Sequence, residues 1–123
     1  MTQPRVKMCG LRQASDAVFA AQAGVDAIGL VFYPPSPRSV DTPTAAKIAH
    51  ALPPFVSCVG LFVDASAAQI DDILQEVPLS LLQFHGDESP EFCNQFQLPW
   101  IKAVRMRPNI DLHEQRQHYS RAQ

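Results

Sequence analysis

The sequence lacks three features that would assign a function quickly: a surplus of positive charge, a long hydrophobic run and closely spaced cysteines. Its 10 Lys and Arg residues against 12 Asp and Glu give a net charge of -2. That balance argues against a nucleic-acid binder that works through a basic stripe, because no excess of cations can displace counterions from phosphates. No apolar run reaches the roughly 18 to 20 residues that span a bilayer, and the first five residues lack the apolar core of a secretory signal. We therefore expect a cytoplasmic protein that binds neither nucleic acid nor membrane.

Cysteine and histidine are few and widely spaced. The three cysteines, Cys9, Cys58 and Cys93, form no CxxC pair, which argues against a disulfide framework and a zinc ribbon. His113 and His118 are separated by five residues, whereas four would place two metal ligands on one helix face. We expect reduced thiols and no metal site.

The chain alternates between short apolar segments and longer segments with helical spacing, a pattern typical of βα units around a parallel sheet. The nearly all-apolar strands are expected to be covered on both faces. Expected helix caps are Ser15, Thr42 and Ser89, with Gly24 ending the first helix. The expected strands cover residues 5–9, 26–32, 55–63, 80–85 and 100–105, and the expected helices cover 14–23, 43–52, 66–75, 90–95 and 111–121.

Five βα units are compatible with two architectures. One is a complete doubly wound five-stranded domain, and the other is the first part of a (β/α)8 TIM barrel. The length of 123 residues favours the first, because a barrel takes about 250. In both, functional residues lie at the carboxyl ends of the strands.

At the end of the first expected strand, Cys9 shares a face with Lys7, while Val6 and Met8 point the other way, toward the helices. A lysine beside a thiol favours the thiolate, so Cys9 is a candidate base or nucleophile. Gly10 would let the chain turn sharply there. The alternative is a small buried core thiol.

Arg38 is the cation of a loop stiffened by three prolines, residues 33–40. A fixed guanidinium suits a carboxylate or a phosphate. The alternative is a solvated arginine that pairs with Asp41.

Gln83 and His85 are two residues apart, so both should face the same side at the end of the fourth strand. Polar side chains on an apolar strand need partners when buried. A ligand pocket would explain both polar side chains. A hydrogen bond to a loop carbonyl would explain the histidine alone.

A phosphoacceptor domain of the doubly wound type would use Asp64 at the end of the third strand and Lys102 on the fifth. It also needs carboxylates after the first strand to hold a divalent ion, and none occurs before Asp16. Without that pair, Asp64 is expected to cap the helix that begins near Ser66.

Several motifs together resemble those of the phosphoribosylanthranilate isomerase family. They agree in order and spacing up to about residue 105. The segments are VKMCG (6–10), GLVFYPPSPRSV (29–40), VGLFVD (59–64), LQFHGDE (82–88) and IKAV (101–104).

The resemblance implies a (β/α)8 barrel, here about its first five βα units, with residues 1–123 as one domain. It implies an isomerase of tryptophan biosynthesis that carries out an Amadori rearrangement of a small phosphorylated substrate without a cofactor. Cys9 matches the base that removes the C2' proton. Arg38 matches the arginine that faces the anthranilate carboxylate, and Gln83 and His85 match polar residues that line the pocket.

The family's general acid is an aspartic acid after the strand that follows the fifth helix, and the sequence stops at Gln123 before such a strand. The phosphate-binding loops after strands 7 and 8 are not included either. We therefore expect the 123 residues alone to be inactive, with the first and fifth strands left as open edges. The alternative is a non-catalytic five-stranded α/β binding module. No prediction of oligomeric state follows.

Overall fold

The computed structural model describes residues 3–123, so Met1 and Thr2, which begin the segment inspected for a secretory signal, lie outside the described residues. Strands and helices alternate along the chain, as the periodicity predicts. The five strands are β1 (Lys7–Cys9), β2 (Ala27–Val31), β3 (Ser57–Phe62), β4 (Leu81–Phe84) and β5 (Trp100–Lys102). The five helices are α1 (Ala14–Gln22), α2 (Thr42–Ala51), α3 (Ala67–Glu76), α4 (Pro90–Asn94) and α5 (Leu112–His118).

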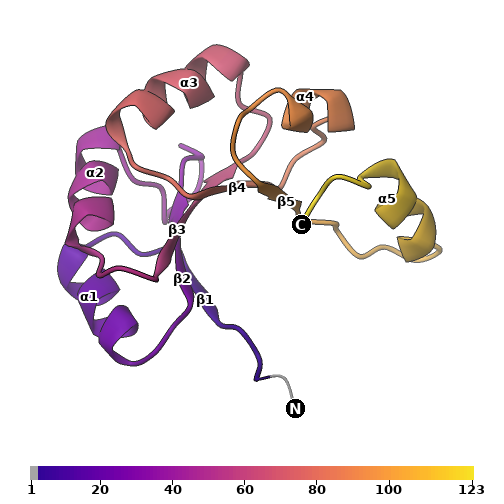
Figure 1. Cartoon of the computed structure of the whole chain (residues 1–123). Coiled ribbons are helices and arrows are strands. Elements are labelled where there is room, and N and C mark those ends of the chain that lie inside the picture. The colour runs from indigo at the N-terminus through magenta and orange to yellow at the C-terminus, as the bar shows by residue number, and fades with distance from the viewer. Residues whose placement is uncertain (1–2) are drawn as a thin grey trace.

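The strands form one parallel sheet in the order β1-β2-β3-β4-β5. Each strand is added at the same edge of the sheet. Because the crossover connections are right-handed, the connecting helices all lie on one face. Figure 1 shows α1 to α4 along the convex side of the sheet, with α5 beyond β5. A doubly wound sheet reverses its strand order and carries helices on both faces. The order therefore identifies five consecutive units of a (β/α)8 arrangement that is not closed into a barrel.

The register gives the sheet two faces of different character. Cys9 pairs with Gly29, Gly29 with Val59, and Leu61 with Gln83. Paired residues of parallel strands point to the same side, so these residues share the concave, inner face. Their neighbours along each strand point outward, toward the helices.

The main core lies between the outer face and the helices. Ile28, Leu30, Phe62, Leu82 and Phe84 are fully buried there, and all five belong to one hydrophobic cluster. Aromatic rings from α4 and from the segment that follows it complete the core at β4 and β5: Phe84 packs against Phe92, Phe96 and Trp100 with centroids 6.0 to 6.1 Å apart.

Three of the expected helix caps, Ser15, Thr42 and Asp64, are wrong. Helix α1 begins after Gln13, which makes no side-chain cap, so Ser15 lies inside the helix. Asp41, not Thr42, caps α2 by accepting a hydrogen bond from the Thr44 amide, because Thr42 and Pro43 already belong to the first turn. Hydrogen bonds from the Thr44 side chain and then from its amide lower the pKa of Asp41.

Ser66, not Asp64, caps α3, in a reciprocal capping box with Gln69. Ser89 caps α4 as expected. Gly24, at φ +99, follows the end of α1, also as expected.

The two ends of the sheet differ from the expectation in detail. Val6 and Met8, expected to face helices, are 47% and 45% exposed because no helix covers β1. Helix α1 packs on α2 and β2 instead. At the other edge, the Gln123 amide donates a hydrogen bond to the Trp100 carbonyl, so the edge of β5 is partly paired. Among residues 3–123, none of the helices is long and apolar enough to cross a membrane.

Candidate functional site

Cys9 ends β1 on the inner face, where the neighbouring strand leaves room for its sulfur. A methyl group on Gly29 would lie 2.9 Å from Cys9 Sγ and 3.3 Å from its Cα, closer than side chains normally approach. Gly10 follows at φ +85 and donates its amide to the Gly29 carbonyl. Two glycines thus hold a half-buried thiol at the strand end, and Cys9 is absent from the main core cluster.

The proline-rich loop folds back over the same strand end. A Cβ atom at Gly10 would lie only 2.7 Å from Arg38 Cδ and Nη1, so Arg38 packs directly over this glycine. Arg38 Nη1 also donates a hydrogen bond to the Cys9 carbonyl at 3.5 Å. The loop is anchored by the Val40 amide on the Val31 carbonyl. In the described part of the chain, Arg38 forms no ion pair with Asp41. The structure therefore places the Arg38 guanidinium, which has no ion-pair partner in residues 3–123, beside Cys9.

Gln83 and Lys7 meet across the inner face, although their strands are not neighbours. Lys7 Nζ donates a short hydrogen bond to Gln83 Oε1. The curvature of the sheet brings β1 and β4 close enough for this contact. The Lys7 ammonium is thus bound to Gln83, and this hydrogen bond links β4 to β1, the strand that carries Cys9.

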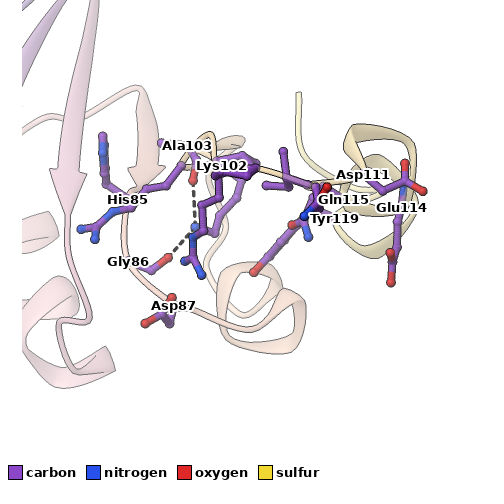
Figure 2. Close-up of a pocket in the computed structure, with 15 residues that line it drawn as sticks. His85, Gly86, Asp87, Lys102, Ala103, Asp111, Glu114, Gln115 and Tyr119 are labelled. Carbon is purple, nitrogen blue, oxygen red and sulfur yellow. Dashed lines mark hydrogen bonds between the residues drawn. The ribbon is translucent and has the colours of Figure 1, made fainter.

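His85 follows β4 and lies next to Gly86, as Figure 2 shows. Its Nδ1 is buried and has no hydrogen-bond partner among the described residues. The loop carbonyl considered above as a partner for this histidine is therefore not found at Nδ1. An orphaned buried nitrogen at a strand end is typical of a position that a ligand or water completes.

Asp64 and Lys102 are the two residues considered above for a phosphoacceptor site. Lys102 points outward from β5 and pairs with Glu88 at 3.7 Å. Asp64, at φ +51, accepts the Asp87 amide through Oδ1 at 2.8 Å. Among residues 3–123, Asp64 and Lys102 form no ion pair with each other, and the carboxylates that a phosphoacceptor site needs after the first strand are missing.

Sequence reasoning missed the buried Glu88–Lys102 pair. Glu88 is 6% exposed, the one charged residue buried in residues 3–123. The available signal was Lys102 itself, a charge in the outward row of an otherwise apolar strand.

Two pockets lie at the strand ends without reaching Cys9. One of about 440 Å³ opens at the ends of β4 and β5 and includes His85 and Arg105 in its lining (Figure 2). Another, of about 620 Å³, lies between the loops after β2 and β3. Neither is lined by Cys9, Arg38 or Gln83. Within residues 3–123 there is no group of His, Cys, Asp or Glu suited to hold a metal ion.

The other two cysteines are structural. Cys58 is 5% exposed on the outer face and Cys93 is fully buried in α4. Burial raises the pKa of each thiol to about 11. Both therefore remain protonated and unreactive at neutral pH.

Comparison with known proteins agrees with this geometry. The profile of the N-(5'phosphoribosyl)anthranilate (PRA) isomerase family matches residues 6–123. An N-(5'-phosphoribosyl)anthranilate isomerase of Alcanivorax borkumensis is 58% identical over 122 residues, which are 99% of this chain and 56% of that protein. The corresponding protein of Neisseria gonorrhoeae is 52% identical over 123 residues, or 59% of its length. The chain thus spans somewhat more than half the length of the curated relatives that it matches.

Solved structures give the same result. The crystal structure of phosphoribosyl anthranilate isomerase from Thermotoga maritima superposes with a TM-score of 0.80 at 41% identity, covering 83% of this chain and 51% of that one. A phosphoribosyl anthranilate isomerase in complex with reduced 1-(o-carboxyphenylamino)-1-deoxyribulose 5-phosphate superposes with a TM-score of 0.87 at 38% identity, covering 92% and 59%. Sequence profile, relatives and fold agree, and the chain belongs to the N-(5'-phosphoribosyl)anthranilate isomerase family.

Proposed function

We propose that these residues form the amino-terminal portion of a (β/α)8 isomerase and supply the general base of an Amadori rearrangement in tryptophan biosynthesis. The substrate is N-(5'-phosphoribosyl)anthranilate and the product is 1-(2-carboxyphenylamino)-1-deoxyribulose 5-phosphate. The observation that carries the proposal is the convergence of Cys9 and Arg38 at one strand end, with the guanidinium 3.5 Å from the Cys9 carbonyl. A cytoplasmic location follows from this biosynthetic role.

In the proposed mechanism an acid protonates the ribose ring oxygen, and the ring opens to a Schiff base. Cys9 then removes the C2' proton, which gives an enolamine that tautomerises to the ketone. Arg38 binds the anthranilate carboxylate through parallel hydrogen bonds. Gln83 and His85 line the pocket, with His85 Nδ1 free to bind a substrate oxygen. The reaction is an internal redox exchange between two carbons and needs no cofactor.

The acid is not supplied by these residues. None of the five strands contains a carboxylate, and Asp64 and Glu88 are engaged by loop amides. The family resemblance assigns the acid to an aspartic acid after a sixth strand, which these 123 residues do not include.

The proposal is tested by restoring the rest of the barrel. In a chimaera, the 123 residues replace the matching segment of the Alcanivorax borkumensis relative. We expect the chimaera to consume N-(5'-phosphoribosyl)anthranilate, measured by its fluorescence, at a rate near that of the relative. The 123-residue chain alone should give no turnover, because it lacks the acid. A folded chimaera without turnover would contradict the proposal, and so would turnover by the chain alone at a normal rate.

Arg38→Ala in the chimaera is expected to raise KM about 100-fold and to change kcat by less than about fivefold, since a carboxylate remote from the reacting carbons is bound equally in ground and transition states. Steady-state kinetics measures both constants. Arg5→Ala, an exposed arginine at the approach to β1, is the matched control and should leave both unchanged. A loss confined to kcat would assign Arg38 to the chemical step instead.

A further inference from the structure

A buried ion pair lies at the ends of three adjacent strands, and its Lys102 lines the same pocket as His85. Glu88 and Lys102 approach to 3.7 Å, with side chains 2% and 6% exposed. Lys102 belongs to the outward row of β5, on the other face of the sheet from Cys9. A buried pair is also weak evidence for stability, because desolvation offsets most of its attraction. Its contacts indicate another role.

The Glu88 carboxylate holds two different loops. Oε2 accepts the Asp64 amide at 2.9 Å, in the loop after β3. Oε1 accepts the Gly86 amide at 2.9 Å, in the loop after β4. Both oxygens are therefore used, and Glu88 is itself held by the Tyr119 hydroxyl, which donates to its backbone carbonyl at 2.8 Å.

The Lys102 ammonium holds the same region from β5. Nζ donates to the carbonyls of Gly86 at 2.6 Å, Ala103 at 3.1 Å and Phe84 at 3.5 Å. Figure 2 shows the bonds to Gly86 and Ala103 as dashed lines. Nζ also lies 5.4 Å from the centre of the Tyr119 ring, a favourable position for a cation.

These bonds meet on either side of His85. The peptide group before His85 is held through the Phe84 carbonyl by Lys102 and through the His85 amide by the Phe62 carbonyl at 2.9 Å. The peptide group after it is held through the Gly86 amide by Glu88. The side chain between them keeps a buried Nδ1 without a partner. A buried polar atom left unsatisfied costs free energy, so the surrounding structure must enforce its position.

We propose that Glu88 and Lys102 are positioning residues that lock the backbone around His85 and so fix the place of its imidazole ring, which lines the pocket at the ends of β4 and β5. The role of His85 as a substrate contact rests on the function proposed above, whereas the locking itself does not. The pair acts through backbone groups, the amides that Glu88 accepts and the carbonyls to which Lys102 donates.

The test uses the 123-residue chain without substrate and follows backbone amide exchange and the ring signals of His85 by NMR. In Glu88→Gln, an NH2 group replaces one of the two carboxylate oxygens that accept backbone amides, and Lys102 loses the negative charge of its partner. We expect the Asp64 and Gly86 amides to exchange at least about tenfold faster, since hydrogen bonds to a charged acceptor are lost. The His85 ring signals should shift or broaden, while the Leu30 amide of the β2 ladder stays protected. Glu91→Gln, an exposed glutamate in the first turn of α4, is the matched control and should change none of these.

Tyr119→Phe provides a second route if Glu88→Gln does not fold. It leaves the ion pair and removes only the hydroxyl donor to the Glu88 carbonyl. We expect faster exchange at Gly86 and altered His85 ring signals in an otherwise unchanged spectrum.

Unchanged exchange at both amides in folded Glu88→Gln would overturn the proposal. If that variant does not fold, unchanged exchange at Gly86 and unchanged ring signals in Tyr119→Phe would overturn it. A uniform loss of protection that includes Leu30 and leaves the His85 ring signals unchanged would also overturn it, because it would assign the pair to general stability. Since no substrate is present, a chimaera without isomerase turnover would refute the proposed function and leave this result standing.

Discussion

Replacing Cys9 with serine in the chimaera is expected to lower kcat by about 10²- to 10⁴-fold, the usual contribution of a general base. A serine hydroxyl has nearly the same shape but is far too weak a base to remove the C2' proton. Affinity for the reduced product analogue that a relative binds should change little, because Cys9 is half-buried and contributes mainly in the transition state. Stopped-flow turnover and calorimetric binding measure the two effects separately.

Cys58→Ala is the control for loss of a thiol. Cys58 lies on the outer face of β3 and is 5% exposed, so its loss should reduce stability and leave kcat unchanged. If Cys9→Ser turned over at the wild-type rate, Cys9 would be removed from the mechanism and the convergence with Arg38 would lose its catalytic meaning.

Phe84→Ala is expected to lower the free energy of unfolding by about 3 to 5 kcal/mol, measured by urea denaturation. Phe84 is fully buried, and its ring contacts Phe92, Phe96 and Trp100, so truncation leaves a cavity where β4, β5 and the α4 region meet. This is a large share of the stability of a small domain. His85 and Gly86 follow directly, so the loss should also loosen the candidate site.

Phe19→Ala is the matched control, because Phe19 lies on α1 and is 73% exposed. Its replacement should change the free energy of unfolding by no more than about 0.5 kcal/mol. Equal losses for the two variants would mean that the aromatic cluster around Phe84 is not the core of this region.

Local pattern was sufficient to predict the five βα units and the strand ends that carry Cys9 and His85. Period-two and helical spacing are short-range properties that depend on neighbouring residues. Cap assignment failed at Thr42 and Asp64 because neighbouring polar residues compete, and backbone geometry made Asp41 and Ser66 the caps. It failed at Ser15 because α1 begins one residue earlier, without a side-chain cap.

The sequence by itself determined the class of the fold and, through its motifs, the family. It placed Cys9 at a strand end and Arg38 in a stiff loop, and both are local facts. Only the tertiary structure decided the strand order, because pairing between strands depends on contacts far apart in the chain. The same holds for the room that Gly29 leaves for the Cys9 sulfur and for the Glu88–Lys102 pair. The burial of the ion pair and the space beside the Cys9 sulfur arise only when segments that are distant in the chain pack together.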